Sequence, residues 1–291
     1  MTVMITRRTL RRTHLLRPDP KLNNLFLYCL AVTSRRFGVL VHAATVMSTH
    51  EHLVVTDTLG VLPRFTQELH RLLALGIKSL RKWEGAAWDH EKTSVVELRT
   101  PQAVLEKMAY CIANPVAAGL VRRAHQWPGI NTAPEHLGRM SWTVKRPEVF
   151  FDQDNPQWPK TVTLKLHMPP KLDVGDAEAR EMVAAEVTRL EERAQLDVET
   201  KGWKVFGREA VLSMSPYKRA KSWEPLRGRH PTFAVGRAQK EAFREAVTLL
   251  RAFRRAHRAA VECWRQGVRD VLFPVGTWLM IWAHGALVAP A

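Results

Sequence analysis

The sequence predicts a mixed α and β fold in which helices cover one face of a sheet. Three observations lead to this prediction. Over residues 1–130, apolar runs typical of strands alternate with runs whose apolar residues recur every three or four positions, as in helices. Helix-start signatures stand at Leu62-Pro63 and Thr100-Pro101. The composition, with 46% hydrophobic and 25% charged residues among 291, is that of a globular protein.

The first elements are two strands and a helix. Residues 2–16 alternate enough to predict a strand with a basic flank. A helix is predicted from about Pro20 to residue 38, with an inner face made of Leu22, Leu25, Phe26, Cys29 and Leu30. The apolar residues 40–55, on both sides of His50, predict one buried strand.

Two helices and a strand complete the first 130 residues. The second helix should open at Leu62-Pro63, a strand should span residues 94–98, and a third helix should begin at Pro101. The apolar stripe of the second helix consists of Phe65, Leu69, Leu72, Leu73, Gly76, Leu80 and Trp83. The resulting β-α-β-α-β-α order indicates a sheet with helices on one face.

The tripeptide His50-Glu51-His52 places two imidazoles on one face of its predicted strand, because strand side chains alternate between faces. The two histidines would lie roughly 7 Å apart along the strand. Paired imidazoles on a rigid sheet face suit a divalent metal. A pair of strand-end histidines bonded to water or backbone would show the same pattern.

Tyr110 lies off the apolar stripe of the third helix. Val104, Leu105, Met108 and Ile112 form that stripe, and Tyr110 falls almost opposite its centre, on the side of Glu106 and Asn114. Pro115 is expected to end the helix near Ala113 or Asn114. The position indicates either a half-exposed tyrosine with its hydroxyl in water or a nucleophile one turn from a metal-ligating amide.

Both segments resemble motifs of one enzyme family. Residues 46–55 resemble the Met-x-x-His-hydrophobe-His-Leu strand of the single-tyrosine HUH transposases. Residues 110–121 resemble the Tyr-x-x-x-Asn-Pro-Val-x-Ala-Gly-Leu-Val segment of their REP-associated branch. The resemblance covers roughly residues 1–130, which it identifies as an HUH nuclease domain. It implies an α+β fold with an antiparallel, ferredoxin-like sheet and helices on one face.

The resemblance also implies an activity and its residues. The activity is that of an endonuclease and strand transferase acting on single-stranded DNA near a hairpin, such as a repetitive palindromic element. His50, His52 and Asn114 match the ligands of Mg²⁺ or Mn²⁺, and Tyr110 matches the nucleophile. Glu51 departs from the family, which has an apolar residue there, so this position on the opposite sheet face is either wet or holds a cationic partner.

Charge and cysteine content favour the same class of partner. The net charge of +16 and pI near 10.3 suit a polyanion, with membrane surfaces and acidic proteins as alternatives. The three cysteines are widely spaced, which argues against a disulfide framework or a cysteine zinc site and for a reducing compartment. With no signal peptide and a broken apolar stretch over residues 271–288, we expect a soluble, cytoplasmic, nucleoid-associated protein.

Residues 131–291 are predicted to form a basic extension with helices at about 176–195 and 237–266 and a short strand at 161–166. Nine basic residues of the first 130 are candidates for phosphate contacts on charge and placement alone: Arg7, Arg8, Arg11, Arg12, Arg35, Arg36, Arg71, Lys78 and Lys82. The sequence leaves a homodimer open.

Three functional alternatives follow from these motifs. The first is the metal-assisted transposase, whose Tyr110 would form a covalent phosphotyrosine. The second is an inactive or domesticated protein that binds DNA hairpins without cleaving them. The third is a metal-dependent hydrolase that uses His50 and His52 with water and does not need Tyr110. If Asn114 is not the third ligand, His42, His90 and Glu106 are the next candidates.

Overall fold

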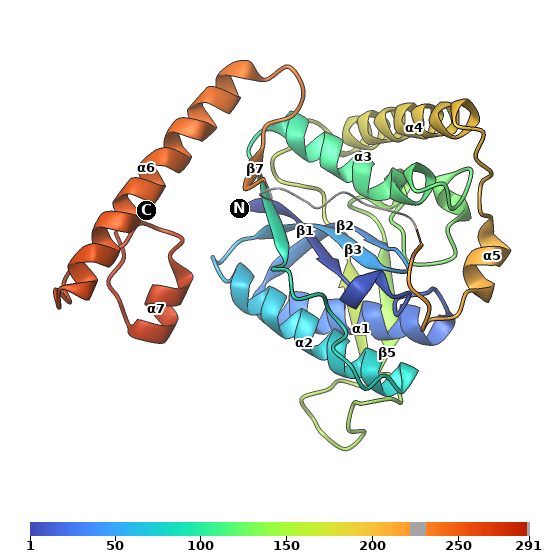
Figure 1. The fold of residues 1–291 in the computed structure, drawn as a ribbon, viewed down its shortest axis with the longest axis horizontal. Coiled ribbons are helices and arrows are strands. Elements are labelled where there is room, and N and C mark those ends of the chain that lie inside the picture. The colour runs from blue at the N-terminus through green and yellow to red at the C-terminus, as the bar shows by residue number, and fades with distance from the viewer. Residues whose placement is uncertain (222–230, 290–291) are drawn as a thin grey trace. The chain divides into compact units, whose positions relative to one another are not determined.

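The computed structural model describes residues 1–221 and 231–289 and contains a five-stranded sheet (Figure 1). The strand order is β2-β3-β1-β4-β7. The four strands that open the chain pair antiparallel, and the two-residue β7 joins β4 in parallel. Their bounds are β1 Thr2–Arg8, β2 Val39–Val46, β3 His50–Asp57, β4 Ser94–Leu98 and β7 Phe233–Ala234.

Two helices connect these strands in the ferredoxin-like β-α-β-β-α-β order. Helix α1 spans Pro20–Phe37 and α2 spans Leu62–Arg81. Asp19 caps α1 by accepting from the Leu22 amide, and Gly38 ends it with a left-handed backbone, φ 64°. The predicted α+β fold with an antiparallel, ferredoxin-like sheet is therefore confirmed.

The prediction of one continuous strand over residues 40–55 is wrong. These residues form a hairpin, in which β2 and β3 are joined by Met47-Ser48-Thr49. The Met47 amide donates to the His50 carbonyl at 2.8 Å. The two strands are both buried on both faces, so their apolar residues run together in the sequence. The link contains no glycine, proline or asparagine that would mark a turn. His50 consequently stands at the start of a strand.

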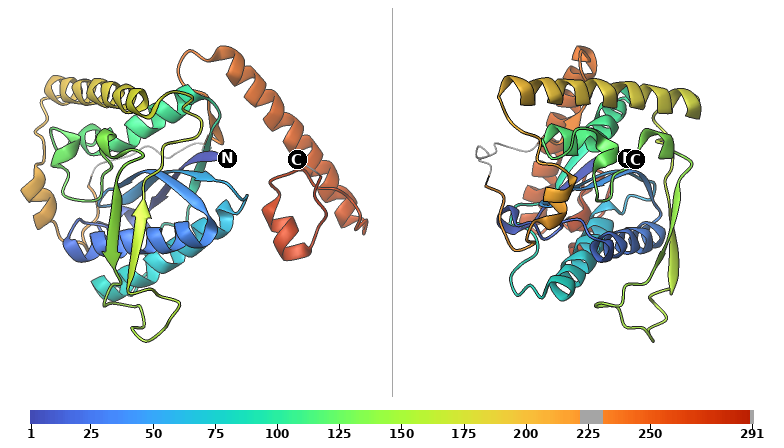
Figure 2. Two further views of the ribbon diagram at one scale, coloured as in Figure 1. Left: turned by 180° about the vertical axis from the view of Figure 1, so that it is seen from behind. Right: turned by 90° about the vertical axis from the view of Figure 1, so that its right-hand side faces the viewer.

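Helices cover both faces of the sheet, whereas the sequence predicted helices on one face only (Figures 1 and 2). Val3 and Ile5 of β1 face α1 and α2, and their neighbour Met4 faces the other side. That second side is covered by α3, Pro101–Ala117, on which α4, Asp176–Thr200, packs. A polar side chain on the α3 side therefore lies between the sheet and a helix, unless it is near a strand end.

Helix α3 does not end before Pro115, contrary to prediction. It continues to Ala117, and the Ala118 amide still donates to the Asn114 carbonyl at 3.0 Å. A proline this close to a helix end removes one backbone donor, and the burial of Val116 (3% exposed) in the core helps to hold the last turn. Asn114 thus lies inside a regular helix.

Residues up to Gly236 belong to the same compact unit as the first 130. The hairpin of β5 (Ser141–Lys145) and β6 (Thr161–Lys165) packs against α1. Short elements complete the unit: η1 Leu10–Arg12, η2 Ala124–Gln126, η3 Pro134–His136 and α5 Arg208–Ser213. The assignment of residues 1–130 as the nuclease domain and 131–291 as an extension remains a prediction.

The second unit, Arg237–Ala291, contains α6 (Lys240–Arg265) and α7 (Trp278–His284). Its small core is formed by Ala260, Phe273 and Ala286. Helices α4 and α6 match the two helices predicted after residue 130, except that α4 runs on to Thr200. Among the described residues, no helix is both long and apolar enough to cross a membrane.

Candidate functional site

The two histidines at the start of β3 face α3 and lie side by side. His52 pairs with Thr6 and His50 with Arg8 across β1. The ring centroids of the two histidines are 4.8 Å apart. Because residues paired across a sheet share a face, these four side chains and α3 lie on the same side.

A threonine hydroxyl holds one nitrogen of each imidazole. Thr6 Oγ1 lies 2.9 Å from Nδ1 of His52, and Thr49 Oγ1 lies 3.0 Å from Nδ1 of His50. A metal-binding histidine commonly has its other ring nitrogen bonded in this way, which fixes both the tautomer and the ring orientation. The nitrogen that would ligate a metal is therefore Nε2 in each ring.

Tyr110 approaches this pair from α3. Its ring centroid lies 5.4 Å from that of His52, and its side chain is 40% exposed. Thr100 caps α3 by accepting from the Ala103 amide at 3.1 Å, which starts the helix as predicted. The predicted stripe from Val104 to Ile112 is buried, so Tyr110 faces away from the core of the helix layer.

Lys107 lies beside Tyr110, and sequence reasoning did not single it out. Its ammonium is 5.3 Å from the centroid of the tyrosine ring. The signal was the spacing, since residues three apart on a helix are neighbours. A cation at this position can stabilise negative charge on the phenol oxygen or on a phosphate next to it.

The other metal-ligand candidates differ in position. Asn114 is buried, 7% exposed, one turn beyond Tyr110. His42 contacts the His167 carbonyl at 2.8 Å and the Thr56 hydroxyl at 2.7 Å, and burial lowers the pKa of His42 to about 4. Glu106 accepts from Gln102, and His90 lies in an exposed loop. In the described part of the chain, no group of three or more His, Cys, Asp and Glu side chains could hold a metal.

Glu51 lies on the opposite sheet face and is hydrogen-bonded to a histidine there. Its side chain is fully buried, and Oε1 is 2.7 Å from Nε2 of His70 on α2. Trp88 packs edge-on to the His70 ring and donates from Nε1 to the His70 carbonyl at 2.8 Å. Of the two alternatives for Glu51, the structure shows a side-chain partner, the His70 imidazole.

A cleft of about 580 Å³ opens at His50 and Tyr110. One wall comes from residues before 121, including Arg12 and His14. Burial, together with the charge of Arg12, lowers the pKa of His14. The other wall comes from the end of α4 and from residues 203–220. The candidate site is therefore built from residues before position 130 of the sequence and from residues after it.

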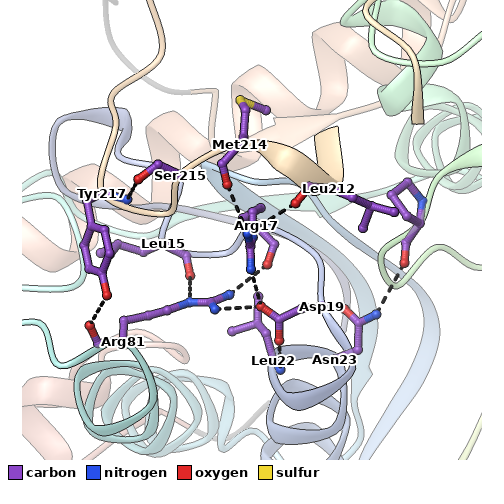
Figure 3. A network of polar contacts seen from close by, with 11 residues as sticks. Leu15, Arg17, Asp19, Leu22, Asn23, Arg81, Leu212, Met214, Ser215 and Tyr217 are labelled. Carbon is purple, nitrogen blue, oxygen red and sulfur yellow. Dashed lines mark hydrogen bonds and ion pairs between the residues drawn. The ribbon is translucent and has the colours of Figure 1, made fainter. Parts of the chain in front are cut away.

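A polar network fastens the second wall to the N-terminal residues (Figure 3). Arg17 donates to the carbonyls of Leu212 and Met214 at 3.2 and 3.1 Å. Asp19 holds both Arg17 and Arg81, at 3.1 and 2.6 Å. Tyr217 donates from its hydroxyl to the Arg81 carbonyl at 2.8 Å. The segment 218–220 pairs by backbone hydrogen bonds with residues 12–14.

The predicted phosphate-binding residues divide into two groups. Arg8 is registered with His50, and Arg12 lines the cleft. Arg7 points to the Glu51 face and donates to the carbonyls of Asp89 and Glu91, so a phosphate contact would require these bonds to break. Arg11 is exposed in η1.

The remaining five cations come from α1, α2 and the C-terminal cap of α2, the helix layer on the opposite face of the sheet from the histidines. Arg36 and Arg71 both bind Glu68, and this hydrogen-bonded ion pair raises the pKa of Arg71. The set consists of Arg35, Arg36, Arg71, Lys78 and Lys82.

No protein-family model and no characterised protein matches the chain. Among the solved structures that are similar to it are two transposases. One is a candidate transposase from Deinococcus radiodurans R1, with 19% identity and TM-score 0.29 over 34% of this chain and 79% of that one. The other is a REP-associated tyrosine transposase bound to a REP hairpin, with 17% identity and TM-score 0.37 over 47% and 79%. Both TM-scores lie below 0.5, so neither likeness bears on function.

Proposed function

We propose that this protein is a single-strand DNA endonuclease and strand transferase of the transposase type that cleaves near a hairpin through a covalent bond to Tyr110. The proposal rests on one observation above all. The ring of His52 lies 4.8 Å from that of His50 and 5.4 Å from that of the exposed Tyr110, both imidazoles are held at Nδ1, and His50 and Tyr110 line a cleft. The two sequence motifs add support because they supply these three residues.

The donor set fits a hard divalent ion such as Mg²⁺ or Mn²⁺. His50 and His52 would bind through Nε2, and Asn114, one turn from Tyr110, would supply an amide oxygen. When bound, such an ion polarises the phosphate and offsets the charge that develops on it. The threonine hydroxyls at Nδ1 support this proposal, because a bond at that nitrogen fixes the ring of a metal-binding histidine.

The chain's own groups carry the remaining steps. A phenol, with a reference pKa of about 10, must lose its proton before it attacks. The Tyr110 oxygen then forms a bond to phosphorus, and the bond between phosphorus and the leaving deoxyribose oxygen breaks. That oxygen takes up a proton and becomes a free hydroxyl. Strand transfer is the reverse step with the hydroxyl of another strand. Lys107 would favour the deprotonated phenol by its charge.

The test is covalent capture of a labelled single-stranded hairpin oligonucleotide in Mn²⁺. The unmodified protein should form a denaturant-resistant adduct, and Tyr110→Phe should not. Tyr28→Phe is the control, because the Tyr28 hydroxyl donates to the Pro159 carbonyl and the residue does not line the cleft, so the adduct should still form. An adduct that survives Tyr110→Phe would refute the proposal.

The same experiment separates the alternatives. A metal-dependent hydrolase would cleave the strand in Tyr110→Phe with no adduct at any stage. A hairpin-binding protein without cleavage would bind the strand equally well in both forms and leave it intact. His50→Ala should abolish cleavage in Mg²⁺ and in Mn²⁺ under the proposal, and normal cleavage by that variant would place the metal elsewhere.

A further inference from the structure

Trp203 is an exposed tryptophan at the cleft that contains His50 and Tyr110. It lines the cleft, and 65% of its side chain is exposed. Large aromatic side chains usually bury their rings, so an indole in solvent beside a candidate active site has no role in the core.

The backbone holds Trp203 in a fixed place. Helix α4 ends with a left-handed Gly202, φ 63°, and the Trp203 amide donates to the Val198 carbonyl at 2.9 Å while the Gly202 amide donates to Glu199 at 3.0 Å. This pattern is a Schellman motif, which closes a helix end. Three residues later, the Phe206 amide donates to the Gly119 carbonyl at 2.9 Å, which ties the segment to the loop after α3.

Cations stand around the indole. The ammonium of Lys201 lies 4.6 Å from the centroid of the Trp203 ring. Arg12 lines the cleft as well, and Arg193 does so while bound to Asp197 at 3.4 Å. A surface that binds single strands has two components, cations and an exposed aromatic ring. The cations bind the phosphates, and a base stacks on the ring.

We infer that Trp203 is a stacking platform for one unpaired base of the DNA strand that enters the cleft, with Lys201 bound to a phosphate of that strand. The inference rests on the proposed function and deepens it, because it names residues after position 130 as part of the substrate-binding site. It also assigns a purpose to the end of α4. Since stacking needs only a flat base, Trp203 sets where the strand lies without selecting its sequence.

The test couples a variant of the protein to a change in the strand. The probe is a fluorescein-labelled DNA hairpin with a single-stranded oligothymidine tail, and a series of probes carries one abasic site at successive tail positions. Affinity is measured by anisotropy. For the unmodified protein, one abasic position should weaken binding roughly 5- to 150-fold, as expected for the loss of one stacked base. Trp203→Ala should weaken binding of the intact probe by a similar factor.

The decisive result is the combination of the two changes. In Trp203→Ala the sensitive abasic position should have no further effect, whereas Trp203→Phe should keep part of it. Phe206→Ala is the control, because Phe206 is an exposed aromatic (48%) of the same segment outside the cleft lining. Phe206→Ala should bind the probes as the unmodified protein does.

The two hypotheses fail in different ways. If the unmodified protein forms the Tyr110 adduct but no abasic position is coupled to Trp203, the platform is refuted and the nuclease stands. If the unmodified protein binds none of the probes, both are refuted. Since Trp203 is mostly exposed, Trp203→Ala should unfold at the same denaturant concentration as the unmodified protein, and a large shift would overturn the interpretation as a binding residue.

Discussion

Replacing His70 with leucine would leave the carboxylate of Glu51 buried without its hydrogen-bonded partner. Glu51 is 0% exposed, and the contact is short, 2.7 Å. Breaking a buried pair on one side costs about 3–5 kcal/mol. For a unit of the size of Met1–Gly236, a loss of about 0.5 kcal/mol in the free energy of unfolding lowers the melting temperature by about one degree. The melting temperature should therefore fall by about 6–10 °C.

The reverse single change, Glu51→Leu, should cost less. It removes the carboxylate, whose charge costs most to bury, and leaves only the imidazole without its hydrogen-bonded partner. Arg7 lies directly across from Glu51 on β1. Burial lowers the pKa of Arg7, although the nearby charges of Glu51 and Asp89 act to raise it. After the change, Arg7 keeps Asp89 and its two backbone carbonyls. We expect a loss of about 1–3 kcal/mol from the unpaired polar group.

The double variant Glu51→Leu with His70→Leu decides the question. Glu51 Oε2 is buried without a hydrogen-bond partner among the described residues, so the native pair is incompletely satisfied. Replacing both partners of a buried polar contact by apolar side chains of similar volume is often neutral or stabilising. The double variant should therefore be close to the unmodified protein, with a coupling energy of at least about 3 kcal/mol in a urea double-mutant cycle.

Additive losses in that cycle would refute the reasoning, because they would mean that each side chain is stabilised by other contacts. The cycle also tests the departure at the centre of the histidine motif. If Glu51 only fills space between the sheet and α2, the double variant should still form the covalent adduct. The reason is that His50 and His52 lie on the opposite sheet face, where Thr49 and Thr6 hold them.

Three further outcomes are expected. The affinity for a single-stranded hairpin should fall with salt, and each phosphate contact should add about 0.7 to the slope of log affinity against log salt concentration, so five contacts would give roughly −3.5. Arg12→Gln should reduce that slope and Arg36→Gln should not. Equal effects of the two changes in a salt titration would remove the distinction between the cations near the cleft and those of α1 and α2. Burial lowers the pKa of His42 to about 4, whereas the imidazole of the unfolded chain binds its proton near pH 6.5. The free energy of unfolding should therefore be full above pH 6.5 and fall by about 3 kcal/mol between pH 6.5 and 4. A His42→Leu variant whose free energy of unfolding in urea falls as steeply with pH over this range would contradict this. Thr6→Val should weaken Mn²⁺ binding about 10- to 100-fold by releasing His52 Nδ1, and unchanged affinity in a metal titration would show that the hydroxyl does not orient the ring.

Local sequence patterns were sufficient for the helices and for the position of Tyr110. The spacing of apolar residues from Val104 to Ile112 defines one face of α3, and a tyrosine off that face must be at least partly exposed. The same reasoning misread the β2–β3 hairpin, because two strands buried on both faces have no alternation to separate them. The end of α3 was misplaced because packing of Val116 outweighed the effect of Pro115.

The candidate site was predictable only in part. His50, His52 and Tyr110 could be identified because each lies in a short motif. The partner of Glu51 could not, since His70 comes to it through the packing of α2 on the sheet. The second cleft wall depends on Arg17 and Arg81, whose bonds join residues far apart in the chain. Such contacts have no local pattern.

The pairing of residues 12–14 with 218–220 has a consequence for the time at which the cleft can form during synthesis. The histidines and Tyr110 are made early, whereas the wall that faces them is made about 100 residues later. At 5–20 residues per second, a ribosome needs roughly 5–20 s to cover that distance. During this interval a nascent chain would carry the proposed nucleophile without the wall that we propose to hold a strand against it. We expect an unfinished chain, even one with α1, α2 and α3 already folded, to be unable to cut DNA beside its own ribosome.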